Sequence, residues 1–216
     1  MTRIIGGRAG GRRITTPRGT TTRPTSDRVR EALFASIEST YGSLSGLRFL
    51  DLYAGSGAVG LEAWSRGAGV VTLVEQDRRT SRLISTNAEA LGFHRVDVVS
   101  TSVAGALSAR PAAPYDVAFL DPPYALGEER VAADLASLAA QAWLVPGAMV
   151  VVERGSRSPE PSWPDGFDGS RQKKYGETVL WYVRAALGTQ SPTSPTTSGP
   201  SVNSPNVPGS PGPGSE

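Results

Sequence analysis

The sequence predicts an α/β fold with a mainly parallel, seven-stranded sheet covered by helices on both faces. Two observations predict it. Short β-prone runs alternate with helical segments from Arg48 to Glu153, and such alternation is typical of parallel sheets. A glycine-rich turn joins the first β-prone run to a helix, as in folds that bind nucleotides. Two further β-prone runs follow and predict a C-terminal antiparallel hairpin at the sheet edge.

The predicted elements follow one another in a regular order. Strands are expected at 48–53, 70–75, 95–99, 115–120 and 148–153, with helices near 58–66, 77–91, 102–109 and 128–143. The closing hairpin is expected at 172–175 and 178–184. Ligands of such sheets bind beyond the carboxyl ends of the strands. The residues that follow each strand are therefore the candidate site.

A basic segment precedes this alternation. Residues 1–30 hold eight arginines and one acid, so they carry +7 and the remainder carries −5 of the chain's net charge of +2. Such asymmetry indicates a nucleic-acid-binding arm on a neutral or acidic body. Glycine pairs punctuate short β-prone pieces in the arm and predict a small hairpin. The alternative is a solvated basic tail.

A helix is expected to follow the arm and to end near Tyr41. Thr25 or Ser26 is the expected N-cap, because both side chains can accept a hydrogen bond from the first turn. Apolar residues recur every four positions and form a stripe that would face the core. Arg28 and Arg30 fall outside this stripe. They either solubilise the helix or contact substrate phosphate.

Composition divides the chain into three regions. Residues 1–22 are predicted to be a basic RNA-binding arm, and residues 23–187 a single α/β domain. Residues 188–216 consist of Ser, Thr, Pro, Gly and Asn with almost nothing apolar. Such a segment cannot bury enough surface to offset its ordering entropy, so a disordered tail is expected.

Composition also limits the class of protein. The chain has no cysteine and one histidine, His94, so thiolate and histidine metal sites are excluded and no metal is expected. No run reaches the roughly 18 apolar residues of a membrane span, and the N-terminal segment has no apolar signal core. These features predict a cytoplasmic protein that does not contact a membrane.

The stretch after the first predicted strand indicates a nucleotide-type cofactor. Gly55-x-Gly57-x-x-Gly60 matches the glycine pattern of nucleotide-binding turns. Glu75 lies 20 residues beyond Gly55, at the end of the second strand. An acid at this place can accept hydrogen bonds from a ribose diol.

The glycine pattern alone would also serve NAD, so an oxidoreductase is one alternative. Asp51 stands ahead of the glycines, where an acid is awkward beside a pyrophosphate but suits a cofactor with a cationic amino-acid end. S-adenosylmethionine is such a cofactor. Hydride transfer also needs a proton donor or base of near-neutral pKa, and His94 lies on the wrong strand for that role.

Asp121-Pro122-Pro123-Tyr124 follows the apolar run 115–120 and ends it abruptly. Two consecutive prolines hold the backbone extended. A carboxylate on one side and a phenol ring on the other then form a rigid shelf, with a hydrogen-bond acceptor and a stacking surface. This arrangement suits a flat molecule that carries an NH2 group, such as a nucleobase.

These motifs together resemble a class I S-adenosylmethionine-dependent methyltransferase with a Rossmann-like fold. The finer resemblance is to the RsmD family of 16S ribosomal RNA guanine-N2 methyltransferases and extends from Arg3 to about Val183. It implies methyl transfer to guanine N2 in an assembled or assembling 30S particle by a monomeric enzyme. The matching blocks are Arg3 to Gly7, Gly11-Arg12, Arg23 to Thr25, Asp27 to Phe34, Asp51 to Ala63, Ser65 to Ala68, Glu75, Asp121 to Tyr124 and Tyr175 to Thr178.

The resemblance assigns roles to particular residues. Asp121 and the Pro122 carbonyl would accept the two N–H groups of the amine, and Tyr124 would stack on the base. The remaining expected residues form two sets. The cofactor set is Asp51, Tyr53, Ala54, Gly55, Ser56, Gly57, Glu75, Gln76, Ser102, Val103 and Asp121, and the RNA-binding set is Arg12, Arg13, Arg23, Arg28 and Arg30.

One departure from the family pattern concerns the adenine. Many class I methyltransferases place an acid after the third strand, whereas this chain has Ser100-Thr101-Ser102-Val103 there. Adenine recognition is therefore expected to depend on backbone groups near Ser102 or Val103.

Several alternatives stay open from the sequence. The tetrapeptide indicates an amino group but not the base that carries it, so another RNA or adenine N6 in DNA is possible. A non-catalytic RNA-binding assembly factor is a further alternative. Removal of residues 1–22 is expected to weaken RNA binding and to leave cofactor binding intact.

Overall fold

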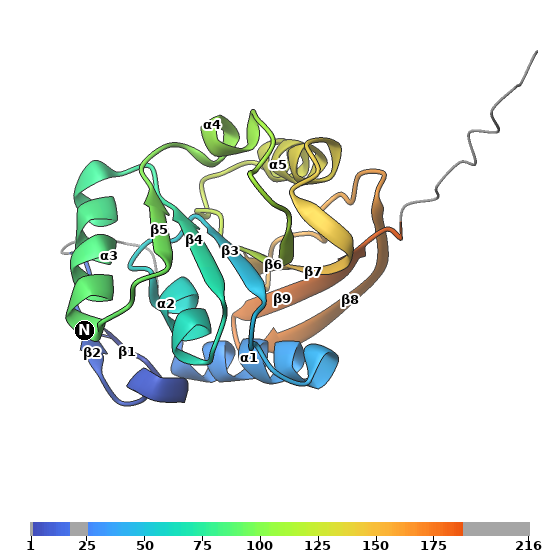
Figure 1. Cartoon of the computed structure of the whole chain (residues 1–216). Coiled ribbons are helices and arrows are strands. Elements are labelled where there is room, and N and C mark those ends of the chain that lie inside the picture. The colour runs from blue at the N-terminus through green and yellow to red at the C-terminus, as the bar shows by residue number, and fades with distance from the viewer. Residues whose placement is uncertain (1, 18–25, 188–216) are drawn as a thin grey trace, which may run out of the picture.

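The structure, a computed structural model, describes residues 2–17 and 26–187 (Figure 1). Its main sheet has seven strands in the order β5-β4-β3-β6-β7-β9-β8. All neighbouring pairs from β5 to β7 are parallel, and β9 is antiparallel to both of its neighbours. The predicted fold class is therefore confirmed. The strands are β3 (Arg48–Leu52), β4 (Val70–Val74), β5 (Val96–Val99), β6 (Tyr115–Leu120), β7 (Leu144–Gly155), β8 (Phe167–Tyr175) and β9 (Thr178–Ala185).

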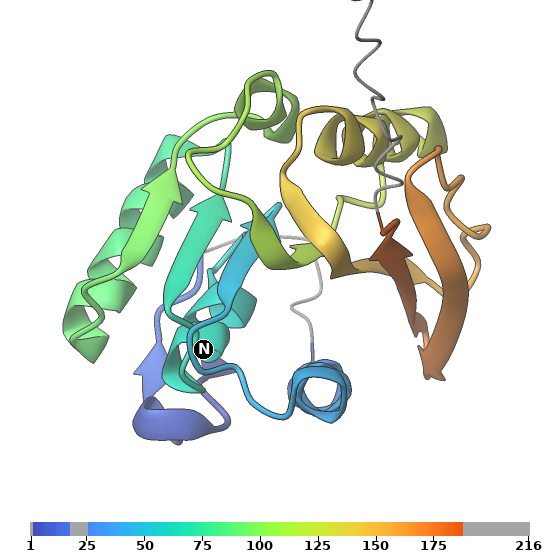
Figure 2. The same ribbon diagram turned by 45° about the vertical axis from the view of Figure 1, so that its right-hand side comes forward.

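Helices cover both faces of this sheet, because each helix has an apolar side and the sheet is apolar on both faces. In Figure 2 the blue α1 lies below the sheet and the yellow α5 lies above it. The helices α1 (Asp27–Tyr41), α2 (Ala58–Ser65) and α3 (Arg78–Leu91) pack on one face, and α4 (Val103–Leu107) and α5 (Glu128–Ala140) on the other. Among the described residues, no helix is long and apolar enough to cross a membrane.

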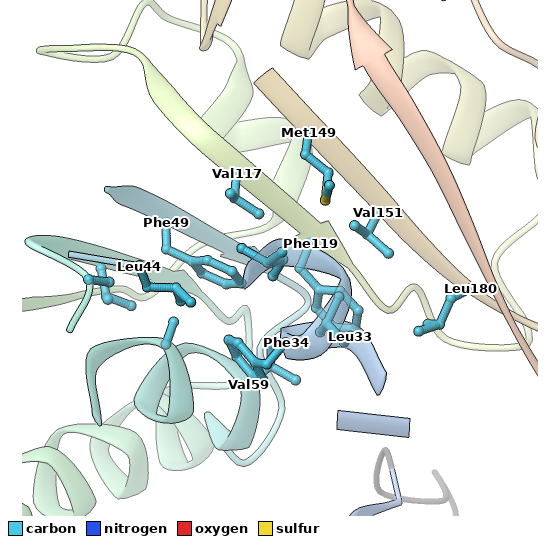
Figure 3. Close-up of a cluster of buried hydrophobic side chains, with 14 of the residues drawn as sticks. Leu33, Phe34, Leu44, Phe49, Val59, Val117, Phe119, Met149, Val151 and Leu180 are labelled. Atoms are coloured by element: carbon cyan, nitrogen blue, oxygen red, sulfur yellow. The ribbon is translucent and has the colours of Figure 1, made fainter. Parts of the chain in front are cut away.

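The core under α1 explains why the four-residue apolar stripe forms a helix at this place. Leu33 and Phe34 pack against Phe49, Phe119 and Val151 of the sheet (Figure 3), and all five side chains are buried. Burial of such side chains contributes roughly 1.5 to 3 kcal/mol each. Packing against the sheet, more than helix propensity, therefore holds α1.

Both ends of α1 are fixed by hydrogen bonds. The Ser26 hydroxyl accepts the N–H of Val29 at 3.3 Å, so Ser26 is the N-cap. At the other end the Tyr41 hydroxyl donates to the Asp116 carbonyl at 2.8 Å and accepts the N–H of Met149 at 3.0 Å. These bonds tie the helix to the start of β6 and to the middle of β7.

Two of the C-terminal strands, β7 and β8, are longer than predicted. β7 begins at Leu144 and not at residue 148, and its pairing with β6 is irregular between Tyr115 and Val117. Pro146 and Gly147 interrupt the β-prone pattern, since Gly147 has φ 76° and Pro lacks a ladder donor. β8 begins at Phe167, five residues before its expected start.

The N-terminal arm folds onto the domain. It forms the hairpin β1 (Thr2–Arg3) and β2 (Arg13–Ile14) around the short 3-10 helix η1 (Gly7–Ala9). Buried Ile4, Ala9 and Ile14 pack against Leu61, Leu91 and Phe93. Residues 2–17 thus share a core with the α/β domain.

Buried polar groups of α2 hold the arm in place. The Glu62 carboxylate, 0 % exposed, accepts the N–H groups of Ile5 and Gly6 at 2.6 and 2.8 Å. The Ser65 hydroxyl accepts the N–H of Ala9 at 2.9 Å and donates to the Gly6 carbonyl at 2.6 Å. A side chain at Gly7 would overlap the Ser65 carbonyl, so only glycine permits this approach.

Candidate active site

A cavity of about 760 Å³ opens at the carboxyl ends of β3, β4 and β6. β3 lies between β4 and β6 in the sheet, so the chain order reverses there. Open α/β sheets bind ligands at such a switch point. The volume lies within the usual range of small-molecule pockets. The cavity therefore stands where the sequence predicts the site.

The loop between β3 and α2 forms one side of the cavity. Gly55 has φ 53° and Gly57 has φ 77°, both in the left-handed region. A Cβ at Gly57 would lie 2.9 Å from Cγ2 of Ile84, and one at Gly60 would lie 2.6 Å from Cδ2 of Leu73. Gly55 allows the turn, Gly57 allows the loop to approach Ile84 of α3, and Gly60 allows α2 to approach β4 closely.

Tyr53 begins this loop in a backbone conformation that is rare for residues other than glycine, with φ 63°. Its hydroxyl donates a hydrogen bond to the buried carboxylate of Asp134 on α5. Burial and this hydrogen bond raise the pKa of Tyr53. The bond holds the strained turn against α5, a contact that the sequence pattern did not indicate.

Asp51 and Glu75 accept backbone hydrogen bonds that stabilise the loop and the start of α2. Asp51 is 1 % exposed and accepts the Gly60 N–H at 2.8 Å. The Glu75 carboxylate accepts the N–H groups of Gly55 at 2.9 Å and Asp77 at 2.8 Å. Both acids line the cavity, so each combines a structural contact with a place beside a ligand.

The lining of the cavity is strongly acidic. Five carboxylates and one arginine, Arg79, are among its described lining residues. Burial raises the pKa of Asp51 to about 8; the Gly60 hydrogen bond opposes this shift, and the charges of Asp121 and Glu75 add to it. A cation would relieve the repulsion among these groups. The acids are Asp51, Glu75, Asp77, Asp121 and Glu153.

Asp121-Pro122-Pro123-Tyr124 leaves the end of β6 and lines the same cavity. The Leu126 N–H donates to the Pro123 carbonyl at 2.8 Å, which closes a turn after the two prolines. The Tyr124 ring is 63 % exposed, and its Cε1 lies 3.0 Å from the place of a Cβ at Gly155. A bulkier residue at the end of β7 would displace this ring.

Most of the expected cofactor residues meet around the cavity. Gly57 and Ser102 are not among its lining residues: Gly57 packs beneath Ile84, and Ser102 caps α4 by accepting the Gly105 N–H at 3.1 Å. The expected residues that line it are Asp51, Tyr53, Ala54, Gly55, Ser56, Glu75, Gln76, Val103, Asp121, Pro122 and Tyr124.

Two of the expected RNA-binding arginines, Arg12 and Arg30, make hydrogen bonds within the fold. The expectation for Arg30 is wrong, because its side chain is 0 % exposed. Its guanidinium donates to the Arg3 carbonyl and to Asp27, each at 2.8 Å, and lies inside the fold. Arg12 donates to the carbonyls of Ala90 and Leu91 at the end of α3.

The other arginines differ in position. Arg13 and Arg28 are exposed and can reach a phosphate backbone. Arg23 lies outside the described residues.

Within the part of the chain that the structure describes, no group of three or more acidic or histidine side chains could hold a metal ion.

Residues that the sequence analysis did not single out also line the cavity. Thr15, Thr16 and Pro17 of the N-terminal segment contribute to its wall, as does Glu153 at the end of β7. Nothing in the local sequence pattern indicated them, because their place depends on how the N-terminal segment crosses the domain.

Comparison with known proteins agrees with this geometry. The family described as "Conserved hypothetical protein 95" matches residues 2–184. The Escherichia coli protein named ribosomal RNA small subunit methyltransferase D is 35% identical over 187 residues, 86% of this chain and 91% of that protein. The Haemophilus influenzae protein of the same name is 34% identical over 160 residues, 73% of this chain and 80% of that protein.

Solved structures share the fold. The Escherichia coli protein yhhF has a TM-score of 0.76 at 31% identity, covering 86% of this chain and 98% of that one. TrmN from Thermus thermophilus has a TM-score of 0.55 at 21% identity, covering 72% of this chain and 48% of that one. The resemblance to the RsmD family is confirmed. The chain belongs to the family described as "Conserved hypothetical protein 95", together with the relatives named ribosomal RNA small subunit methyltransferase D.

Proposed function

We propose that this protein transfers a methyl group from S-adenosylmethionine to the exocyclic N2 of a guanine in small-subunit ribosomal RNA. The observation that carries the proposal is that the Asp121 shelf lines an acidic cavity together with the turn at Gly55. The names of the relatives support ribosomal RNA of the small subunit as the substrate. The carboxylate supports an amino group as the acceptor, and the family resemblance supports guanine.

The volume and the acidic lining of the cavity suit this cofactor. The left-handed turn at Gly55 brings the backbone to the cavity wall without side chains in the way. Asp51 would hold the cationic amino-acid end, and Glu75 would accept hydrogen bonds from the ribose. The Glu75 carboxylate already accepts two N–H groups, but an ionised carboxylate has about four acceptor sites and can bind hydroxyls as well. When bound, S-adenosylmethionine supplies an electrophilic methyl group.

The shelf would hold the base for reaction. The base must leave its stack to reach the cavity, and the exposed Tyr124 ring offers a stacking surface worth about 1 to 3 kcal/mol. Asp121 and the Pro122 carbonyl would accept the two N–H groups and aim the nitrogen lone pair at the methyl group. As the bond between nitrogen and the methyl carbon formed, the bond from that carbon to sulfur would break and S-adenosylhomocysteine would leave. The carboxylate would stabilise the positive charge on nitrogen until the proton is lost to water.

Asp121→Ala is expected to reduce methyl transfer by about a hundred to a thousand fold, because it removes a preorganised charge that acts in the transition state. Cofactor affinity should persist, since Asp51 and Glu75 remain. The measurement is transfer of labelled methyl groups to ribosomal RNA, with calorimetric cofactor binding beside it. Asp97→Ala, which removes an exposed acid of β5 that is not among the lining residues of the cavity, is the matched control. A near wild-type rate for Asp121→Ala would refute the proposed role.

Cofactor affinity is expected to depend on pH through Asp51. Its pKa is raised to about 8 in the free protein, and a cationic ligand favours the ionised carboxylate. Binding should therefore tighten as pH rises from 6 towards 8, by up to about tenfold per pH unit, and then level off. Calorimetric dissociation constants across this range test it. Asp51→Asn should abolish the dependence, and a flat wild-type profile would contradict the proposal.

The exposed arginines Arg13 and Arg28 would contact RNA phosphates and fix the register of the substrate rather than choose the base. Arg23 belongs to the same proposal. The substrate would be an assembled or assembling 30S particle in the cytoplasm, bound by one copy of this chain. No contact with a membrane is proposed, and no metal.

Arg13→Gln and Arg28→Gln are each expected to lower the slope of log affinity against log salt concentration by about 0.7 to 0.9, because each phosphate contact releases about one counterion. RNA titrations at several salt concentrations measure this slope. Arg110→Gln is the control, because this exposed arginine precedes the start of β6, whereas the cavity lies at the carboxyl ends of the strands. Equal slopes for all four proteins would exclude these contacts.

A further inference from the structure

Part of the cavity wall comes from a segment outside the α/β domain. Thr15, Thr16 and Pro17 follow β2 and line the cavity together with the glycine loop and the Asp121 shelf. We call these three residues the N-terminal strap. Thr16 and Pro17 are half-buried. The strap therefore packs against the domain at the place where the proposed cofactor binds.

One buried side chain holds the strap by both of its polar atoms. The Asn87 carboxamide accepts the Thr15 N–H at 3.0 Å through its oxygen and donates to the Thr15 carbonyl at 2.9 Å through its nitrogen. Asn87 is 5 % exposed. At such a buried site little water is present to compete for the hydrogen bonds, so they are stronger than at the surface. These two hydrogen bonds satisfy the N–H and the carbonyl of Thr15, as pairing with a neighbouring β-strand would.

The position of Asn87 places the strap along α3. Thr80 and Leu83 of α3 line the cavity, and Asn87 lies one helical turn beyond Leu83 on the same side of the helix. Arg12 fixes the preceding residues, because its guanidinium donates to the carbonyls of Ala90 and Leu91. Two anchors on one helix thus set the path of the segment that closes the cavity on the α3 side.

We propose that the N-terminal strap is part of the binding site for the adenosyl cofactor and that Asn87 is the positioning residue that holds it there. This inference depends on the proposed function for the identity of the ligand. An anchored strap is already ordered when the ligand arrives, whereas a detached one would have to be ordered at the expense of affinity. The arm and the cofactor site are thus one unit, and removal of residues 1–22 would weaken cofactor binding as well.

The test measures binding of S-adenosylhomocysteine to the full chain by calorimetry. Asn87→Ala is expected to raise the dissociation constant by about tenfold, because the strap must then be ordered on binding. Thr16→Gly/Pro17→Gly keeps the anchor but removes the strap side chains, and it should weaken binding similarly. Thr86→Ala is the matched control, because the Thr86 side chain is exposed and, among the described residues, donates its hydrogen bond to the Arg82 carbonyl of its own helix. Its dissociation constant should stay at the wild-type value.

A second measurement separates positioning from general stability. Hydrogen exchange at the Thr15 and Thr16 amides should slow when S-adenosylhomocysteine is added to the wild-type protein, and it should not slow in Asn87→Ala. If Asn87→Ala fails to fold, the strap double variant decides alone. The inference would be overturned by wild-type affinity in the double variant. It would also be overturned if exchange at the wild-type Thr15 and Thr16 amides did not slow on addition of S-adenosylhomocysteine. A wild-type protein that binds no S-adenosylhomocysteine would instead overturn the proposed function.

Discussion

The close packing of α2 against the sheet is the constraint on which the rest of the site depends. At Gly60 a Cβ would lie 2.6 Å from the Leu73 side chain and 3.1 Å from Oδ2 of Asp51. Only a residue without a side chain lets the helix start this close to β3 and β4. That distance allows the Gly60 N–H to bond the buried Asp51 at 2.8 Å. It also brings the glycine loop to the edge of the cavity.

The opposite side of α2 carries the N-terminal arm. Glu62 and Ser65 bind the backbone from Ile5 to Ala9, and the chain then passes to α3 and the cavity wall. One short helix therefore fixes the cofactor loop on one side and the start of the arm on the other. The Tyr53–Asp134 bond adds a tie from the same loop to α5, the helix that follows the Asp121 shelf. Groups that would bind the donor and the acceptor of the methyl group thus belong to one connected structure.

The sequence predicted the parts of this molecule that depend on local pattern. Alternating β-prone and helical runs sufficed for the sheet and its helices, and the turn and cap chemistry of Gly55 and Ser26 placed two helix starts. The pattern was wrong for Arg30. A stripe counted from Val29 leaves Arg30 outside, although Arg30 precedes Phe34 by four residues and shares its buried side of α1. The buried face of α1 therefore includes neighbouring positions such as Arg30 and Phe34, besides the positions that recur every four residues from Val29.

The rest depended on contacts between distant segments. Asn87 and Asp134 are polar residues on helices, a pattern that ordinarily indicates a solvent-exposed face, yet they are 5 % and 2 % exposed. Their partners lie 72 and 81 residues away in the chain. The strap shows the same limit, because only the folded arrangement brings Thr15 to Pro17 into the cavity wall.

The most direct measurement is to incubate the protein with labelled S-adenosylmethionine and small ribosomal particles from a strain that lacks it, and then to identify the labelled nucleoside. The account predicts label in the small-subunit RNA as N2-methylguanosine. Label on adenine N6, or no label beside a protein that binds the cofactor, would contradict it.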